Sequence, residues 1–97
     1  MEQIFIGLIM GEGCFSGDSH YPRLDIKLHA RDLALLQTLA IRFDGLVYGP
    51  YFHGGRNYAI LRFIGKRLSP IITLVAEQMP PCYKRLQFDQ WREKWGI

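Results

Sequence analysis

The sequence predicts an α+β domain in which one four-stranded antiparallel sheet carries its helices on a single face. Residues 23–29 alternate polar and apolar side chains without a break, which is typical of a strand with one wet face and one buried face. Two aromatic and β-branched runs, 46–52 and 58–64, flank a Gly-Gly turn and predict a hairpin. Apolar residues at helical spacing occur in the other segments, so the expected order is αββαββα with an additional C-terminal helix.

The first helix is expected at residues 2–12 and is apolar around most of its circumference. A helix with apolar residues on all sides is normally buried on all sides. A chain of 97 residues has too small a core to surround one helix completely. The segment therefore predicts a subunit interface.

The next three elements are a short strand, its hairpin partner and a helix. Residues 15–20 are expected to pair with the strand at 23–29. Asp32 is expected to cap a helix over residues 33–43, because aspartate is a favoured N-cap residue. Asp-Gly at 44–45 is expected to close that helix.

The C-terminal half is expected to contain the second hairpin and two helices. Its turn is expected at residues 53–57, and Pro50 predicts that the strand before the turn is an edge strand or contains a bulge. Ser69 is expected to be the N-cap of a helix that begins at Pro70 and ends at Met79. Two further prolines stop this helix, and a last helix follows at residues 83–95.

Composition favours one folded domain over residues 1–97. Hydrophobic residues make up 48% and charged residues 22% of the chain, which argues against disorder. The net charge is +3, and eight of the twelve basic residues are arginine. This balance indicates a mild preference for nucleic acid or another polyanion.

Cysteine content and the N-terminus predict the compartment. Cys14 and Cys82 are too few and too far apart for a disulfide framework or a zinc motif, so free thiols in a reducing compartment are expected. The apolar start is short and has no basic flank, which argues against a signal peptide or a membrane helix. We expect a soluble intracellular protein, in the cytoplasm, an organelle or a phage-infected cell, with no membrane partner.

The uncovered face of the sheet is a candidate binding surface. Counting by twos places Ala59, Leu61 and Phe63 toward the helices. The residues expected on the opposite face are Arg23, Asp25, Lys27, His29, Tyr58, Ile60 and Arg62, with Arg56 nearby. Such a mixture suits the reading of base edges and the binding of phosphates. The alternative is the ordinary wet face of an antiparallel sheet.

Residues 5–13, FIGLIMGEG, allow two interpretations of Glu12. In one, Gly13 ends the helix in the left-handed conformation and Glu12 points into water. In the other, Gly7 and Gly11 allow a second backbone to approach closely, and Glu12 is placed in a functional site. Each helical glycine costs about 1 kcal/mol relative to alanine, and the first interpretation accounts only for Gly13.

This nonapeptide resembles the motif after which the LAGLIDADG homing endonuclease family is named. The element order that follows also resembles the core of that family, so the resemblance covers nearly the whole chain. It implies an unusually small, single-motif, homodimeric enzyme that makes double-strand breaks with short 3′ overhangs at a roughly palindromic DNA site. The motif helices of two copies would pack together through Ile4, Gly7, Leu8 and Gly11.

The resemblance also implies site residues. Glu12 falls on the last acidic position of the motif, so Glu12 and Gly11 would bind a divalent metal, usually Mg²⁺. Lys84 resembles the basic residue that the family carries after its third helix, with Arg85 as the second candidate. Ala30 occupies the matching position of a polar residue at the end of the second strand, where His29 or Arg31 could substitute. The expected DNA-binding residues are Arg23, Asp25, Lys27, His29, Arg31, Arg56, Tyr58, Arg62 and Arg85.

Two other functions remain open from the sequence. A chain of this fold can be a DNA-binding regulator or an intron-splicing maturase without catalysis, in which case Glu12 would be a relic or a cap. A dimerisation protein without a nucleic acid partner is the third possibility, and an absent or salt-insensitive DNA affinity would support it.

Overall fold

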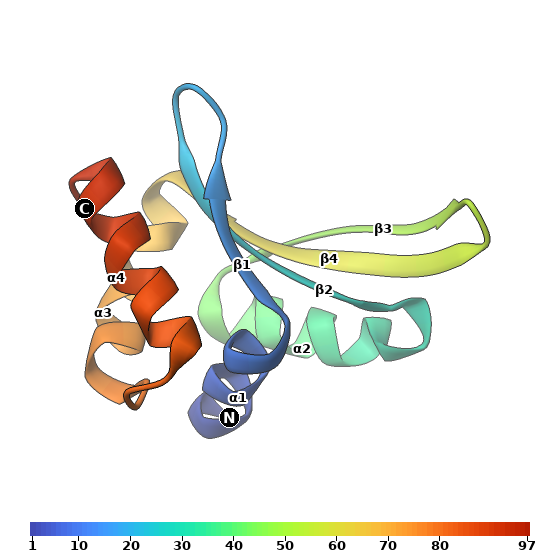
Figure 1. The fold of residues 1–97 in the computed structure, drawn as a ribbon. Coiled ribbons are helices and arrows are strands. Elements are labelled where there is room, and N and C mark those ends of the chain that lie inside the picture. The colour runs from blue at the N-terminus through green and yellow to red at the C-terminus, as the bar shows by residue number, and fades with distance from the viewer.

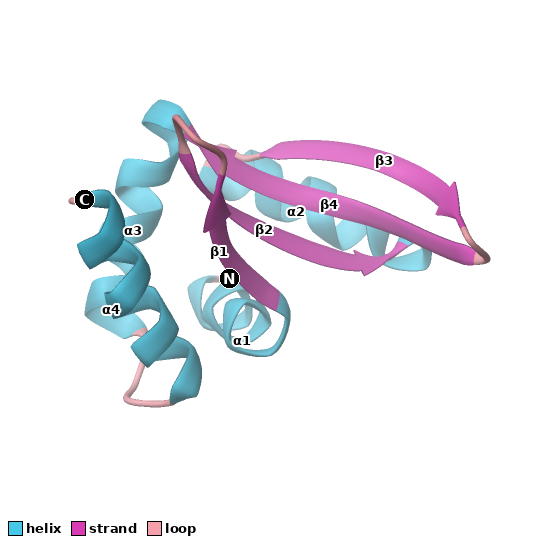
Figure 2. Cartoon of the chain, turned by 45° about the horizontal axis from the view of Figure 1, so that its top comes forward, coloured by secondary structure: helices cyan, strands magenta, loops and turns pink.

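The computed structural model describes residues 1–97, with four antiparallel strands in one sheet and four α-helices against one face of it (Figure 1). The elements are α1 (Glu2–Glu12), β1 (Gly13–Gly17), β2 (Pro22–His29), α2 (Leu33–Phe43), β3 (Leu46–His53), β4 (Arg56–Ile64), α3 (Leu68–Gln78) and α4 (Tyr83–Trp95). The strand order is β1-β2-β4-β3, and Figure 2 shows the opposite face of the sheet free of helices. The predicted fold class is confirmed. None of the helices combines the length and apolar character that a membrane crossing requires.

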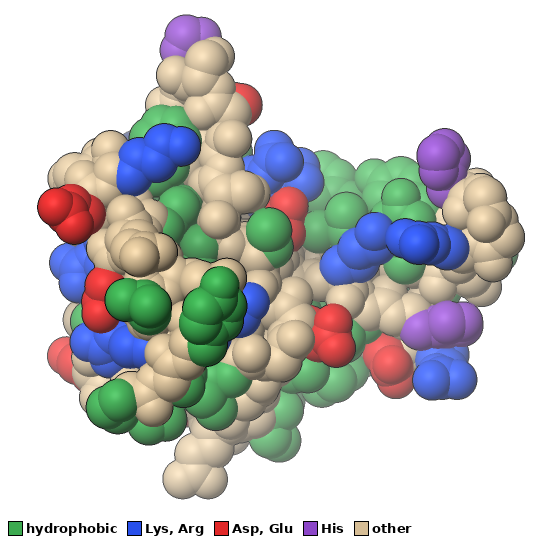
Figure 3. Space-filling model, in the orientation of Figure 1, with side chains coloured by type: hydrophobic (Ala, Val, Ile, Leu, Met, Phe, Trp, Pro, Cys, Tyr) green, Lys and Arg blue, Asp and Glu red, His purple; other side chains and the backbone are tan.

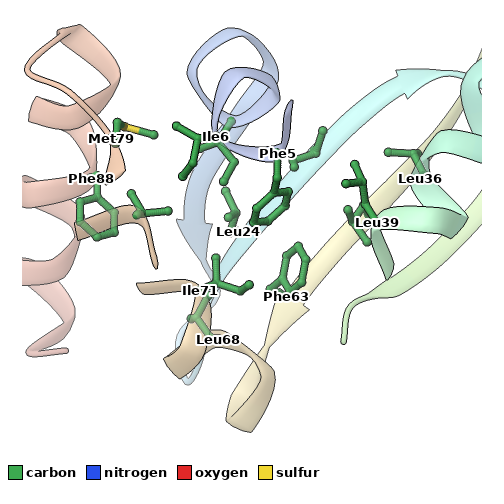
Figure 4. Close-up of a cluster of buried hydrophobic side chains, with 14 of the residues drawn as sticks. Phe5, Ile6, Leu24, Leu36, Leu39, Phe63, Leu68, Ile71, Met79 and Phe88 are labelled. Carbon is green, nitrogen blue, oxygen red and sulfur yellow. The ribbon is translucent and has the colours of Figure 1, made fainter. Parts of the chain in front are cut away.

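The core lies between the sheet and the helices. Ala59, Leu61 and Phe63 of β4 are fully buried, as are Leu24 and Ile26 of β2, so the predicted alternation is confirmed. Figure 4 shows how the helices close around these strands. The helical side chains drawn there in the core are Phe5, Ile6, Leu36, Leu39, Leu68, Ile71 and Phe88, and Met79 joins them from the position directly after α3.

Helix α1 is buried on one side only within a single chain. Phe5 is fully buried, stacks on Phe43 with ring centroids 4.3 Å apart, and meets Phe63 edge-on at 5.5 Å. On the other side of the helix, Ile4 is 54% exposed and Met10 is 36% exposed. The apolar residues that predicted burial on all sides therefore leave an uncovered surface on this chain.

Strand β1 differs from its predicted position at 15–20, because it starts at Gly13 and ends at Gly17. The Asp18 carboxylate accepts hydrogen bonds from the backbone N–H groups of His20 and Tyr21, at 2.8 and 2.9 Å. These bonds close the hairpin turn and lower the pKa of Asp18. The predicted strand was placed too late because this turn begins directly after Gly17.

Gly13 does not adopt the left-handed conformation expected of a helix-ending glycine. Its φ of −69° and ψ of 143° are extended, and the chain passes from α1 into β1 without a loop. A Cβ at this position would lie 2.6 Å from the Ile9 carbonyl oxygen. Glycine is therefore required here by close packing of backbone on backbone.

Replacement of Gly13 by alanine is expected to lower the free energy of unfolding by about 1–3 kcal/mol, since the helix end must shift to make room for the methyl group. Urea unfolding followed by circular dichroism measures the change. Unchanged stability would contradict the packing role of this glycine.

The helix starts differ from the predicted caps. Asp32 stands at the N-cap position of α2, but its side chain makes no capping bond, because a 3₁₀ helix at Ala30–Asp32 already leads into α2. Helix α3 begins at Leu68, not Pro70, and follows a second 3₁₀ helix at Gly65–Arg67, so Ser69 is inside the helix and is not its cap. The predicted end of α2 is confirmed, with Asp44 in the left-handed region at a φ of 60°.

The β3–β4 hairpin turns at Gly54 and Gly55, as predicted, but the strands extend to His53 and from Arg56, so the connection is shorter than the predicted 53–57. Only Gly54 and Gly55 lie outside the strands, with φ values of 58° and 78°, as a two-residue turn with positive φ at both positions requires. Strand β3 is an edge strand, and its pairing register shifts between Tyr48 and Tyr51, around Pro50. Both features predicted from this proline are confirmed.

Candidate functional site

Glu12 is the last residue of α1 and is exposed. Because Gly13 is extended, the helix ends directly at the sheet, and Glu12 stands where α1 meets the first strand. Its carboxylate forms no hydrogen bond or ion pair within the chain. It is therefore available to a partner from outside the chain.

Lys84 reaches the same junction from the first turn of α4. Its Nζ donates a hydrogen bond of 2.7 Å to the carbonyl oxygen of Gly13, which directly follows Glu12. Both cysteines are free thiols, as expected, and Cys82 serves as the N-cap of α4, where its Sγ accepts from the Arg85 N–H at 3.4 Å. The cap and the bond to Gly13 together hold the lysine ammonium beside the end of α1.

Arg85, the second basic candidate, is bound elsewhere. Its Nη1 donates to the carbonyl oxygen of Met79 at 2.7 Å, and its Nε donates to Asp89 at 3.2 Å. These contacts hold the guanidinium against the α3–α4 connection. The structure thus places Lys84, and not Arg85, at the α1–β1 junction.

The donors at this junction fit a hard divalent cation. No three histidine, cysteine or acidic side chains of one chain come together as a metal cluster. Mg²⁺ does not need one, because it commonly takes one or two carboxylates and completes its coordination with water and phosphate. Glu12 supplies a carboxylate, and Gly11 lies in the last helical turn, where carbonyl oxygens lack intrahelical partners. The negative end of the helix dipole also favours a cation there.

The outer side of α1 is a stripe of four residues, Ile4, Gly7, Leu8 and Gly11, of which Leu8 is half-buried against the core and the other three are exposed. A Cβ added at either glycine would meet nothing within 4 Å, so the packing of this chain does not require glycine at these positions. In the space-filling view, hydrophobic side chains lie uncovered over α1 and the start of α4 (Figure 3). The stripe therefore has the properties of a surface that a second chain could approach closely.

The sheet face opposite the helices carries the predicted polar residues, and the strand register decides this. Cross-strand partners share a face, and β2 and β4 pair Asp25 with Arg62, Lys27 with Ile60 and His29 with Tyr58. Figure 3 shows Lys and Arg side chains over the sheet and its β3–β4 hairpin. We call this surface the outer sheet face; its residues on β2 and β4 are Arg23, Asp25, Lys27, His29, Arg56, Tyr58, Ile60, Arg62 and Ile64.

Strand β3 adds aromatic residues to the outer sheet face that the sequence did not identify. Tyr48 pairs with Ile60, and Tyr51 pairs with Tyr58, so both tyrosines face outward. They are three positions apart, which breaks the alternation by twos. The register shift at Pro50 explains the break, and the proline was the only signal of it in the sequence.

Charged side chains on the outer sheet face bind one another. Asp25 accepts two hydrogen bonds from Arg62, at 2.8 and 3.0 Å, and Arg23 lies 3.4 Å from the same carboxylate. The bonds to Asp25 raise the pKa of Arg62. Arg62 also lies over the Tyr48 ring, with 5.1 Å between the guanidinium carbon and the ring centroid.

The end of β2 holds the three remaining candidates. His29 lies on the outer sheet face, and its Nδ1 accepts a hydrogen bond of 3.0 Å from the backbone N–H of Arg31. This bond starts the 3₁₀ helix in which Ala30 is the first residue. The Arg31 side chain is exposed and makes no bond within the chain.

Solved structures provide the comparison that decides the fold. The chain is similar to the homing endonuclease I-TnaI, with a TM-score of 0.78 and 22% identity over 96% of this chain and 69% of that one. The meganuclease I-AabMI bound to uncleaved DNA gives a TM-score of 0.78 at 25% identity, over 96% of this chain and 35% of that one. I-LtrWI, a LAGLIDADG homing endonuclease bound to target DNA, gives 0.79 at 18% identity, over 99% and 36%.

This chain has the LAGLIDADG homing endonuclease fold. The resemblance found in the nonapeptide is thereby confirmed at the level of the fold. The chain spans about a third of the length of I-AabMI and I-LtrWI and about two thirds of I-TnaI. No family model and no curated protein matches the sequence. In the LAGLIDADG fold of this chain, Glu12 stands at the end of the motif helix and Lys84 beside it.

Proposed function

We propose that the protein is a site-specific, homodimeric DNA endonuclease that depends on a divalent metal. The observation that carries the proposal is the α1–β1 junction, where Glu12 ends the motif helix with an unpaired carboxylate and Lys84 binds the carbonyl oxygen of the next residue, Gly13. DNA-bound enzymes of the same fold support DNA as the substrate. The expected products carry short 3′ overhangs, as the resemblance to the family implies.

A second copy of the chain would complete the site. One chain supplies one carboxylate at the junction, whereas cutting both strands of a duplex requires chemistry at two phosphates. Pairing of the α1 stripes would bring two Glu12 residues together, and Gly7 and Gly11 leave room for close approach of the helices. The two-fold symmetry of such a dimer accounts for a roughly palindromic target.

Each junction residue has a separate role in this mechanism. Glu12, with main-chain oxygen from Gly11, would hold Mg²⁺, which when bound supplies Lewis-acid stabilisation and a more acidic water. Lys84 places a positive charge next to the scissile phosphate and stabilises negative charge that develops there. Its bond to Gly13 keeps the ammonium in place before DNA arrives.

The outer sheet face would lie against the duplex. Its Arg and Lys side chains can bind phosphates, and an antiparallel ribbon can enter the major groove. Tyr48, Tyr51 and Ile60 add apolar surface that can contact thymine methyl groups. The face would therefore supply both affinity and sequence preference.

The proposal is tested with the purified protein and a pool of randomised DNA duplexes. Bound duplexes are recovered by gel shift and sequenced, and the selected duplex is then incubated with Mg²⁺ or with EDTA. Metal-dependent cleavage of the selected duplex at one position would support the proposal. Selective binding without breaks would favour a DNA-binding regulator or maturase, and failure to bind DNA would leave a dimerisation protein.

Replacement of Lys84 by methionine is expected to slow cleavage of the selected duplex about 10- to 100-fold, because the positive charge at the α1–β1 junction is lost. DNA affinity should change little. Single-turnover cleavage and gel shift measure the two quantities. The control is Lys94→Met, which removes the same charge from an exposed position of the same helix. Equal effects of the two substitutions would contradict a local role for Lys84.

A further inference from the structure

Asp25 is the only acidic residue of the outer sheet face on β2 and β4, and it lies between two arginines. Arg62 binds it through two separate hydrogen bonds, Nε to Oδ1 at 2.8 Å and Nη2 to Oδ2 at 3.0 Å. Arg23 approaches the same Oδ2 to 3.4 Å. The carboxylate side chain is only 16% exposed. Both of its oxygen atoms are therefore engaged, and little of it is open to a base edge.

The bonds to Asp25 use one side of the Arg62 guanidinium and leave the other free. A guanidinium has five N–H donors, and Nε with one N–H of Nη2 faces the carboxylate. The remaining edge, formed by Nη1 and the second N–H of Nη2, carries two parallel donors. Two such donors match the O6 and N7 acceptors of guanine in the major groove.

The free edge of Arg62 is also held in orientation. Asp25 fixes the guanidinium in its plane, and the ring of Tyr48 lies 5.1 Å from its central carbon. A long arginine side chain normally loses rotamer freedom when it binds a base. In the folded protein the contacts of Arg62 already restrict its rotamers. Binding a base therefore costs less side-chain entropy, which leaves a higher affinity.

Arg23 differs from Arg62 in this respect. Its Nε is buried and has no hydrogen-bond partner, because the 3.4 Å approach to Asp25 lacks the geometry of a bond. Nothing comparable to the two-bond contact orients its guanidinium. Of the two arginines, only Arg62 is prepared for contact with a defined base.

We infer that Asp25 is a positioning residue that acts through Arg62, and that this pair selects a guanine at one position in each half of the target duplex. The inference rests on the proposed function, because it requires that the outer sheet face meets the major groove. It gives Asp25 a different role from the direct base contact expected from the sequence.

The test is selection from randomised duplexes with the wild-type protein and three variants: D25N, R62K and D44N. Asparagine keeps the shape of Asp25 but removes the charge and one acceptor. Lysine keeps the charge of Arg62 but cannot donate two parallel hydrogen bonds. Asp44 serves as the control: it is 82% exposed, lies 3.5 Å from Arg67 outside the outer sheet face, and has a left-handed backbone that asparagine tolerates.

The wild-type protein should prefer guanine at one symmetric position by about 5- to 150-fold over other bases. D25N and R62K should both reduce the preference at that same position to about threefold or less and leave the other positions unchanged. D44N should retain the full preference. Thermal unfolding confirms that each variant is folded. R62K removes the proposed base contact but keeps Asp25, so it separates the role of Arg62 from that of Asp25.

Three results would overturn the inference. A wild-type motif without the guanine would do so, as would a D25N motif identical to that of the wild type. The third result is a base preference that D25N loses and R62K keeps. Asp25 would then contact that base itself and would not act through Arg62. In these cases DNA selection still occurs and the proposed function stands. Absence of any DNA selection by the wild-type protein would overturn both.

Discussion

Replacement of Glu12 by glutamine is expected to reduce metal-dependent cleavage of the selected duplex by about 10³-fold or more. Glutamine keeps the size of the side chain but removes the negative charge that would hold the metal, and Glu12 belongs to no group of three or more histidine, cysteine or acidic side chains that could hold it instead. DNA affinity should stay within about threefold of wild type, because phosphates are bound by cations and hydrogen-bond donors and a carboxylate supplies neither. Single-turnover cleavage over a range of Mg²⁺ concentrations, with gel shifts in Ca²⁺, measures both.

The control for this variant is Glu77→Gln, the same chemical change at an exposed position of α3. It should cleave at the wild-type rate. A Glu12→Gln protein that cleaves normally would remove Glu12 from the mechanism. Loss of both cleavage and binding would show instead that Glu12 is needed for the folded dimer or for the DNA complex.

Replacement of Ile4 by aspartate is expected to raise the dissociation constant of the dimer by at least about 100-fold, or about 2.7 kcal/mol. Ile4 is 54% exposed on the single chain and lies on the uncovered stripe of α1. A dimer through this stripe would bury it, and an unpaired charge in its place would have to be removed from water twice in a symmetric interface. Sedimentation velocity over a range of protein concentrations measures the change.

Ile41 offers a matched control for that substitution. It is 87% exposed on α2, away from the α1 stripe, so Ile41→Asp introduces the same charge in place of the same side chain. This variant should form dimers as the wild type does. Equal weakening by both substitutions, or no weakening by Ile4→Asp, would show that the α1 stripe is not the contact between subunits.

Gly13 and Lys84 show why the α1–β1 junction could be predicted only in part. The nonapeptide and the resemblance it carries proposed Glu12, and they proposed Lys84 as the basic residue with Arg85 as the second candidate. Two adjacent basic residues at the start of a helix look alike in sequence. Only the packing of α4 against β1 directs one to Gly13 and the other to Met79 and Asp89.

The outer sheet face also could be predicted from the sequence only in part. Alternation by twos placed the side chains of β2 and β4 on the correct faces, because each position of a strand has only two possible sides. It could not show that Asp25 is bound by Arg62, which is 37 residues away. It also missed Tyr48 and Tyr51 as a pair, since a change of register depends on how β3 meets β4.

The sequence by itself determined the element order, the buried faces of the strands and the position of an acidic residue at the end of the first helix. These features follow from periodicity and local backbone preference, which neighbouring residues decide among themselves. The tertiary structure decided that Gly13 is extended, that Lys84 binds its carbonyl oxygen, and that Asp25 is bound by arginines. Such contacts join residues from different elements, so they depend on how the elements pack and not on any local pattern.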